Sequence, residues 1–233
     1  MKKQKKIVVM TGAGMSAESG LKTFRDANGL WEGHDVMEVA SPEGFRKNPE
    51  LVLEFYNQRR RQLLQVHPNA GHEALVRLEE KFEVQIITQN VDNLHEKAGS
   101  SQVLHLHGEL LKVRSVRDEN HVLHWEKDLV LGDLDENGHQ LRPHIVWFGE
   151  MVPLLEEAAH QTQQADLVII IGTSMQVYPA ASLIHYAPSQ SSIYFVDPAP
   201  AVNTHDFGNL TILQQTAAEG VPSLVQELLG KEG

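Results

Sequence analysis

The sequence contains no cysteine among its 233 residues, which excludes disulfides, thiolate zinc sites and a cysteine nucleophile. It also lacks an apolar run near the roughly 18 residues of a membrane-spanning helix, and the run 7–10 is too short for a signal peptide. Basic residues are scarce: 20 Lys and Arg oppose 31 Asp and Glu. The net charge of −11 would repel a nucleic-acid backbone. We therefore expect a cytoplasmic protein that binds neither membranes nor nucleic acids.

Hydrophobic residues make up 41% and charged residues 22% of the chain, as in ordinary globular proteins. Short apolar runs rich in Val and Ile recur along it, and they are typical of strands buried on both faces of a parallel sheet. Helical patterns at 69–81 and 154–164 separate several of these runs. This alternation predicts a doubly wound, mostly parallel, Rossmann-like α/β sheet with ligands at the carboxyl ends of its strands. The predicted strands are 7–10, 84–88, 103–106, 145–148, 167–171 and 193–196.

Two stretches interrupt the alternation of strands and helices. Residues 26–67 form a long, mostly helical insertion, and residues 113–143 are polar, with a turn signal at Asn137-Gly138. We predict that both insertions build a smaller lobe, with a cleft between it and the sheet. The whole chain, 1–233, would then be one unit: a large domain of 1–25, 68–112 and 144–233, and a lobe of 26–67 and 113–143.

The first predicted strand runs into a glycine-rich turn. Gly12, Ala13, Gly14, Ser16 and Ala17 satisfy the dinucleotide pattern G-x-G-x-x-G/A. Glycines there let the backbone approach a pyrophosphate, whose charge is favourable at a helix N-terminus. A glycine turn without a ligand is the alternative. The pattern is also a variant, because no second strand delivers an acidic residue about 20 positions later.

Polar side chains cluster after the next two strands. Gln89, Asn90 and Asp92 follow 84–88, and amide groups can read a ribose or a carboxamide because they both donate and accept. Capping of a helix by Asn90 or Asp92 is the alternative, although it explains one residue and not the set. His107 ends the strand after that, where a neutral imidazole is a suitable general base for a sugar hydroxyl. His105, one pleat deeper, is a structural candidate.

Two weaker signals follow. The segment 143–150 resembles an edge strand that accepts another backbone, and 171–174 is a strand feeding a small-residue turn that binds phosphate or ribose through its N–H groups. Together, the motifs and their order resemble the sirtuin family of NAD-dependent protein lysine deacylases. The matching segments are GAGMSAESGLKTFR (12–25), TQNVDNLH (88–95), LHGEL (106–110), PHIVWFGE (143–150), GTSMQVYPA (172–180) and VDP (196–198).

The resemblance implies that NAD, as co-substrate, lies across the carboxyl edge of the sheet. Its phosphates would lie near Ala13, Gly14, Thr173 and Ser174, and Asp197 near the adenine ribose. In sirtuins the acyl oxygen of a modified lysine attacks the ribose carbon that bears nicotinamide, and the histidine of the HG motif then deprotonates a ribose hydroxyl. The products are free lysine, nicotinamide and an O-acyl-ADP-ribose.

The roles that the resemblance implies for individual residues are as follows. The catalytic residues would be His107, Asn90 and Asp92. The cofactor-binding residues would be Gly12, Ala13, Gly14, Ser16, Ala17, Phe24, Arg25, Gln89, Asn90, Asp92, Gly172, Thr173, Ser174, Asp197 and Ala218. An acyl-lysine peptide would add as a strand to Val146–Glu150. The substrate-binding residues would be Tyr56, Arg59, Val146, Trp147, Phe148, Gly149, Glu150 and Val177.

The chain departs from the family where most sirtuins hold a structural zinc with two cysteine pairs. Ser115 stands about where the first cysteine is expected. We considered the histidines His121, His124 and His139 as replacement ligands, and we expect no metal. The lobe must then bury other surface, because structural zinc contributes on the order of 10 kcal/mol in small fingers. We predict apolar packing by Val116, Val122, Leu123, Trp125, Leu129 and Leu131.

A second feature lies in the predicted helix 51–64. Tyr56 and Arg59 share a face with apolar residues, whereas Arg61 points away. A guanidinium and a phenol in that stripe need an anionic partner, and together they could hold a carboxylate. An internal ion pair is the alternative. The string EFYNQRR resembles the sirtuins that prefer malonyl, succinyl or glutaryl lysine, so we predict desuccinylase and demalonylase activity above deacetylation.

Other functions stay open at this stage. The same NAD site would serve a protein ADP-ribosyltransferase or an NAD glycohydrolase, and a non-catalytic NAD-sensing module would need only the binding motifs. A hydride-transferring dehydrogenase fits less well, because the amide cluster and His107 surround the ribose. The expected partners are proteins or peptides that carry acyl-lysine. The sequence identifies no target, and a monomer is the working expectation.

Overall fold

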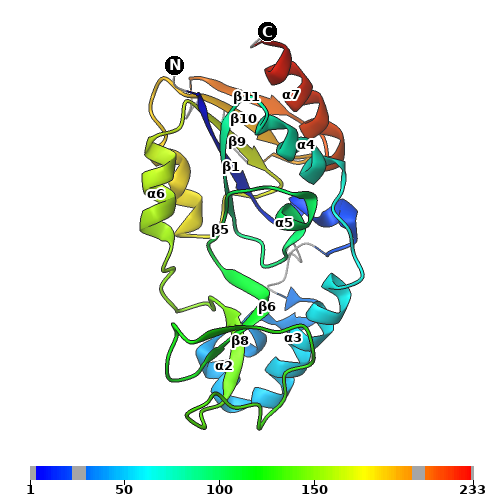
Figure 1. The fold of residues 1–233 in the computed structure, drawn as a ribbon, viewed down its shortest axis with the longest axis vertical. Helices are drawn as coiled ribbons and strands as arrows, with labels where there is room; N and C mark the ends of the chain where they lie inside the picture. The colour runs from blue at the N-terminus through cyan, green and yellow to red at the C-terminus, as the bar shows by residue number, and fades with distance from the viewer. Residues whose placement is uncertain (1–3, 23–29, 201–207, 232–233) are drawn as a thin grey trace.

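The computed structural model describes residues 4–22, 30–200 and 208–231. In Figure 1 a large sheet with its helices occupies one half of the molecule, and α2, α3, β6 and β8 occupy the other half. Both termini lie at the end of the large-sheet half that is remote from the second half. Within the described residues, no helix is both long and apolar enough to cross a membrane.

The large sheet has six parallel strands in the order β11-β10-β9-β1-β4-β5. The strand order reverses at β1, which pairs with β4 on one side and β9 on the other. In sheets of this kind ligands bind at the carboxyl ends beside that reversal. The predicted doubly wound α/β class is confirmed. The strands are β1 (Lys6–Thr11), β4 (Glu83–Thr88), β5 (Val103–His105), β9 (Leu167–Ile171), β10 (Ser192–Val196) and β11 (Leu210–Leu213).

Helices cover both faces of this sheet, because its strands are apolar on both sides. Ile7 and Val9 of β1 belong to a core formed with α4 (Ala70–Leu78) and α7 (Ala217–Lys231). Val8 and Met10, which point the other way, pack toward α6 (Leu155–Gln163) and the 3-10 helix η3 (Ala180–Tyr186). Each strand thus buries two apolar faces, as the unbroken Val and Ile runs predicted.

The second half of the molecule is built around α3 (Pro49–Leu63) and an antiparallel sheet of order β7-β6-β8. The predicted domain boundaries at 112/113 and 143/144 fall inside β6 and β8, so this sheet begins at Gly108, before the predicted insertion. The domain division itself stays a prediction. The other elements here are α1 (Val36–Val39), α2 (Pro42–Lys47), β2 (Leu30–Trp31), β3 (His34–Asp35), β6 (Gly108–Ser115), β7 (Val122–His124) and β8 (Leu141–Ile145).

The predicted strand at 145–148 is wrong. Strand β8 ends at Ile145 and belongs to the antiparallel sheet. The chain then turns, because the N–H of Phe148 donates to the carbonyl of Ala40 and Gly149 adopts a left-handed φ of 89°. The four apolar residues 145–148 have the pattern of a buried strand, but after Ile145 they form a turn between the two halves of the molecule.

The predicted apolar replacement for zinc is also largely wrong. Val116, Leu123 and Leu131 are 42%, 38% and 46% exposed, and of the six residues only Leu129 is fully buried. Polar contacts secure that segment instead. The amide of Asn57 on α3 donates to the carbonyl of Leu129 at 3.0 Å and accepts from its N–H at 2.8 Å.

Two charged side chains complete the polar framework of this half. Arg60 is fully buried and donates from Nε to the carbonyl of Leu110 and from Nη1 to Asn57. The carboxylate of Asp135 accepts from the N–H groups of Asn137 and His139, both at 2.8–2.9 Å. A hydrogen bond from the Ser115 side chain, followed by these N–H groups, lowers the pKa of Asp135 to about 2. The Asp135 carboxylate is thus charged and contacts His139, one of the three histidines considered as metal ligands.

Candidate active site

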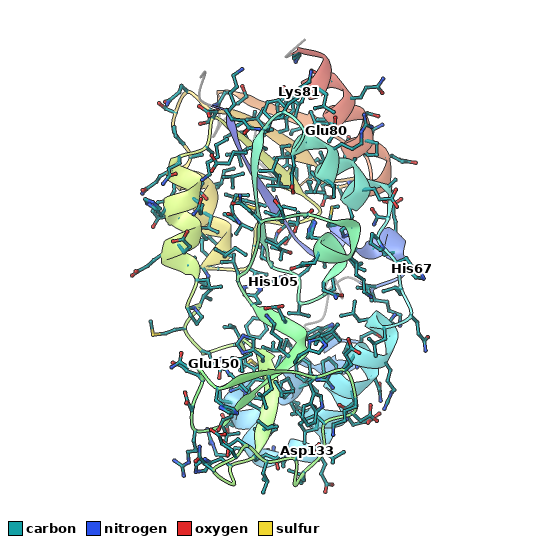
Figure 2. All side chains as sticks on the ribbon, in the orientation of Figure 1. His67, Glu80, Lys81, His105, Asp133 and Glu150 are labelled. Carbon is teal, nitrogen blue, oxygen red and sulfur yellow. The ribbon has the colours of Figure 1, made fainter. Side chains whose placement is uncertain are left out.

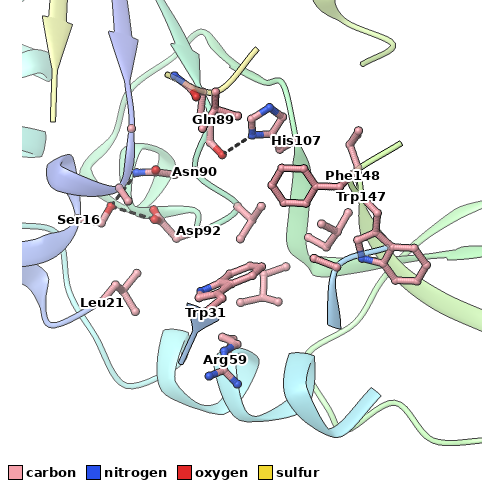
Figure 3. Close-up of a pocket in the computed structure, with 18 of the residues that line it drawn as sticks. Ser16, Leu21, Trp31, Arg59, Gln89, Asn90, Asp92, His107, Trp147 and Phe148 are labelled. Atoms are coloured by element: carbon pink, nitrogen blue, oxygen red, sulfur yellow. Dashed lines mark hydrogen bonds between the residues drawn. The ribbon is translucent and has the colours of Figure 1, made fainter. Parts of the chain in front are cut away.

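A cavity of about 300 Å³ opens between the two halves of the molecule, at the carboxyl ends of β1, β4 and β9. Figure 3 shows side chains from both halves converging on it, with His107 and Asn90 on one side and Arg59 of α3 on the other. Eighteen of the predicted site residues line it: Gly12, Ala13, Ser16, Tyr56, Arg59, Gln89, Asn90, Asp92, His107, Val146, Trp147, Phe148, Gly149, Glu150, Gly172, Thr173, Ser174 and Val177.

Two glycine-containing loops form the end of the cavity next to β1 and β9. The N–H of Gly12 donates to the carbonyl of Ile171, and the N–H of Gly14 donates to the carbonyl of Gly172. A Cβ atom at Gly172 would lie 2.4 Å from the carbonyl carbon of Gly14, and one at Gly12 would lie 2.7 Å from Cβ of Thr173. Gly172 also has a left-handed φ of 59°. The glycines are therefore required for the loops to touch each other.

A polar cluster of three side chains joins the first loop to the end of β4. The Ser16 hydroxyl donates to Asp92 at 2.9 Å and accepts from the Asn90 amide at 3.1 Å (Figure 3). The other Asp92 oxygen accepts from the N–H of Leu94. Burial raises the pKa of Asp92. Asn93 occupies the N-cap position of helix α5 (Leu94–Ala98) without a capping bond from its side chain, and Asp92 supplies an acceptor to the first N–H of this helix.

His107 lies just beyond β5, with one ring nitrogen fixed. Its Nδ1 is 3.1 Å from the carbonyl oxygen of Gln89 (Figure 3). A carbonyl can only accept, so Nδ1 carries the hydrogen and the lone pair of the neutral ring lies on Nε2. Burial lowers the pKa of His107, so the ring is neutral near pH 7. His105 has another role: it contacts Glu96 at 2.6 Å and the carbonyl of Asn90 at 3.1 Å. Figure 2 shows it between the two halves.

Tyr56 and Arg59 reach the far end of the cavity from α3. The Tyr56 hydroxyl accepts from Nε1 of Trp147 at 2.9 Å, and burial raises its pKa, so its own hydrogen remains available for donation. Arg59 donates from Nη1 to the carbonyl of Phe55 and lies 3.7 Å above that ring. Its Nη2 is 3.9 Å from Glu32, and its Nε has no hydrogen-bond partner in the described part of the chain. The internal ion pair considered as the alternative is therefore present only as this long contact between Arg59 and Glu32.

The turn after β8 forms the side wall of the cavity. Glu150 accepts from the N–H of Trp147 at 2.8 Å and pairs with Arg142 at 2.6 Å and with Arg114 at 3.2 Å. The Val146 N–H donates to the carbonyl of His107. Several N–H groups of this segment are thus already used within the chain, and peptide addition along it stays a prediction.

Comparisons with known sequences and structures identify the family to which this chain belongs. A model of the Sir2 family matches residues 12–179. The chain belongs to the Sir2, or sirtuin, family.

Its relatives match over nearly their full length. An NAD-dependent protein deacylase of Helicobacter pylori is 60% identical over 97% of this chain and 98% of its own. The NAD-dependent protein deacylase SIR2rp3 of Leishmania major is 47% identical over 98% of both chains. A solved Sir2 homologue in complex with NAD superposes with a TM-score of 0.88 at 37% identity, covering 99% of this chain and 92% of that one. A solved Sir2 protein with a deacetylated p53 peptide and 3′-O-acetyl ADP-ribose superposes with a TM-score of 0.79 at 31% identity. The match covers 97% of this chain and 94% of that one.

Four predicted cofactor residues of this sirtuin do not line the cavity. Gly14 and Ala17 lie behind its wall, in the first 3-10 turns η1 (Ala13–Met15) and η2 (Ala17–Ser19). Asp197 is buried after β10, and the N–H of Ala218 donates to Glu18 at the start of α7. Phe24 and Arg25 lie outside the described residues. The roles of all six stay predictions.

Several residues that line the site were not predicted from the sequence. Lys22 and Glu32 form an ion pair of 2.9 Å beside Arg59, and Trp31 packs edge-on against Phe55. Trp31 and Glu32 lie in the insertion 26–67, which has no recognisable pattern, and Lys22 lies in the matching segment 12–25, where no role was predicted for it. As to metals, the described residues contain no group of three or more His, Asp or Glu side chains suited to an ion. The absence of zinc stays a prediction.

Proposed function

We propose that this sirtuin removes acyl groups from lysine side chains of proteins in an NAD-dependent reaction and that it favours succinyl and malonyl over acetyl. Relatives that share 47–60% of its sequence bear the name NAD-dependent protein deacylase. The observation that carries the proposal is the bond between Nδ1 of His107 and the Gln89 carbonyl, because it leaves the basic lone pair on Nε2 of a residue that lines the cavity together with ribose-type donors and acceptors.

The residues present fit NAD by their chemistry. Gly12, Ala13 and Thr173 expose backbone at the carboxyl end of the sheet, where phosphates bind well. Ser16 and Asn90 offer neutral donors and acceptors of the kind that a ribose or a carboxamide requires. When bound, NAD would supply the ribose carbon that accepts the acyl oxygen and the hydroxyl that accepts the acyl group.

The chain's own groups would then work as follows. Nε2 of His107 takes a proton from a ribose hydroxyl, since the other nitrogen is held as a donor by Gln89. Asn90, fixed by the Ser16 hydroxyl, orients the ribose and the nicotinamide amide. The lining of Val146, Phe148 and Val177 keeps water from the reacting atoms.

Acidic acyl groups are the proposed preference because the cavity ends in two donors, Arg59 and Tyr56, of which Arg59 has only a long ion pair of 3.9 Å to Glu32. Arg59 is largely buried, and burial lowers its pKa, an effect that Glu32 partly offsets. A carboxylate at the end of a succinyl chain would pair with this guanidinium and accept from the Tyr56 hydroxyl. A neutral acetyl group leaves both donors unused.

The test is a panel of acetyl-, malonyl-, succinyl- and glutaryl-lysine peptides, assayed with and without NAD. We expect turnover only with NAD, no turnover in His107→Ala, and the highest kcat/KM for the acidic groups. Arg59→Met should lower kcat/KM for succinyl peptide by about 10- to 100-fold, as the loss of a charged hydrogen bond implies, and change the acetyl value little.

Arg61→Met is the matched control. Arg61 lies on the same helix but is half exposed and pairs with Glu54 and Asp128 away from the cavity. The Arg61→Met substitution should leave kcat/KM unchanged for both the succinyl and the acetyl peptide. Equal losses for the succinyl and acetyl peptides in Arg59→Met would overturn the acidic preference, and NAD-independent turnover would overturn the deacylase assignment. Labelled ADP-ribose on protein, without deacylation, would favour the transferase alternative.

A further inference from the structure

A series of buried polar side chains runs behind the cavity wall without lining it. Thr11 and Thr88 are direct partners on β1 and β4, and their hydroxyls are 2.8 Å apart. The N–H of Asn90 donates to the Thr88 hydroxyl at 3.0 Å. On the other side, Nε2 of His95 is 3.1 Å from the Thr11 hydroxyl. Thr11, Thr88 and His95 are at most 1% exposed, so these contacts are protected from water.

A second buried histidine, His72 on α4, packs beside this series against the ring of His95. The N–H of Asn69 donates to Nδ1 of His72 at 3.3 Å, so that nitrogen carries no hydrogen and Nε2 carries it. Burial lowers the pKa of His72 to about 4 and lowers that of His95 as well, so both rings are neutral near pH 7. Nε2 of His72 is therefore a buried donor, and it has no acceptor in the described part of the chain.

The direction of the bonds follows from what remains unpaired. If the Thr11 hydroxyl donates to Thr88, His95 must donate from Nε2 to Thr11, and Nδ1 of His95 is left as an acceptor without a donor. The ring of His95 lies 4.9 Å from that of His72 between centroids. The two rings therefore leave one buried donor and one buried acceptor, with no hydrogen bond between them in the described part of the chain. The reverse direction would place two buried donors beside each other, which is unfavourable.

We infer that His95, Thr11 and Thr88 form one directed hydrogen-bond chain that positions Asn90 for the reaction, with the ring of His72 packed beside that of His95. The inference rests on the proposed function, in which Asn90 orients the ribose and nicotinamide. Asn90 is held from three sides: its N–H by Thr88, its carbonyl by His105 and its amide by Ser16. The hydrogen-bond chain fixes the contact between the N–H of Asn90 and the Thr88 hydroxyl. Its members are positioning residues, since none of them lines the cavity.

The first experiment removes single hydroxyls at nearly constant shape. Thr88→Val and Thr11→Val should each lower kcat for deacylation by about tenfold, because displacements of an ångström or less have effects of this size or larger, and should leave KM for the acyl peptide unchanged. The matched control is Thr162→Val. Thr162 is fully buried like the other two, and its hydroxyl donates to the Ala158 carbonyl on α6, away from the chain. We expect its kcat to equal that of the wild type.

The second experiment separates positioning from stability at His95. Glutamine places its amide nitrogen close to the position of the ring Nε2, whereas asparagine does not reach it. His95→Gln should therefore keep kcat within about twofold of the wild type, and His95→Asn should lose about tenfold, as for the threonines. A merely structural role would lower the melting temperature in both variants and leave kcat at the wild-type value in each, which would overturn the inference.

A third measurement is independent of activity. The ¹⁵N chemical shifts of the imidazole nitrogens should report Nε2–H tautomers for both His72 and His95. A His95 protonated at Nδ1 overturns the directed chain, whatever the activity. If the wild type shows no NAD-dependent deacylation, the proposed function fails, and the tautomers then decide alone whether the chain exists.

Discussion

The Tyr56 hydroxyl accepts a 2.9 Å hydrogen bond from the indole nitrogen of Trp147, and neither side chain is more than 2% exposed. This bond links α3 to the turn after β8, two segments 91 residues apart in the sequence. The guanidinium of Arg142 stacks on the other side, 3.4 Å from the Trp147 ring centre. At this end of the cavity the orientation of Tyr56 thus depends on that of Trp147.

Tyr56→Phe should lower the free energy of unfolding by about 1–3 kcal/mol, because the buried Trp147 N–H would lose its acceptor. Denaturant titration with an unchanged m-value measures the loss. Tyr186→Phe, at a 45% exposed position, should change the stability by less than about 0.5 kcal/mol. A Tyr56→Phe protein as stable as the wild type would show that the bond contributes nothing.

The pH dependence of catalysis should reflect the buried environment of His107. Burial lowers its pKa below the ordinary 6.5, so the ring stays neutral and basic as the pH falls through 7. We expect the acid limb of kcat/KM for NAD, which reports the free enzyme, to have its midpoint below pH 6.5. A midpoint above 6.5 would contradict this assignment, as would an identical limb in His107→Ala with residual activity.

Asp135→Asn should loosen the loop that follows β7, because the N–H groups of Asn137 and His139 donate to this carboxylate. Hydrogen exchange at those two amides should become faster. In the wild type the pKa of Asp135 is lowered to about 2, so its contribution to stability is complete above about pH 4 and is lost as the pH falls toward 2. Asp118→Asn is the control, since its carboxylate holds a single N–H in an exposed turn. Unchanged exchange in Asp135→Asn would contradict this role.

Chelator treatment should leave the melting temperature unchanged, since the lobe of α3 and β6–β8 is held by Asn57, Arg60 and Asp135. Scanning calorimetry with and without 1,10-phenanthroline measures this, and elemental analysis should find zinc well below one equivalent. A lower melting temperature with chelator, or stoichiometric zinc, would show that metal contributes to the fold after all.

The sequence predicted the large sheet well, because strands buried on both faces have a simple signature. The runs at 7–10, 84–88 and 167–171 correspond to β1, β4 and β9 within one or two residues. Strand β11 and helix α7 were not predicted, and the run at 145–148 was assigned to a strand. Ile145 and Trp147 of that run are buried against α3 and β6, whereas Phe148 is exposed. The periodicity of the sequence carries no information on such distant partners.

The second half of the molecule was harder to predict for the same reason. Of three consecutive arginines, Arg60 is the one that is fully buried, and the carbonyl of Leu110 that it binds lies 50 residues away. His72 and His95 are single histidines in helices, with no spacing that marks them as a pair. The cavity residues near β1, β4 and β9 were predictable because their motifs are local, whereas the polar framework behind them depends on tertiary contacts.

The contact between Gly14 and Gly172 leaves no room for even one methyl group, while α3 presents its side chains to the opposite end of the cavity. The two ends are therefore unequally open to evolutionary change. Under the proposed function, exchanges on one turn of α3 would change which acyl chains are accepted, whereas almost any mutation at the glycine contact forces the two loops apart. New acyl specificities would then arise in this architecture without changes at the glycine end of the cavity.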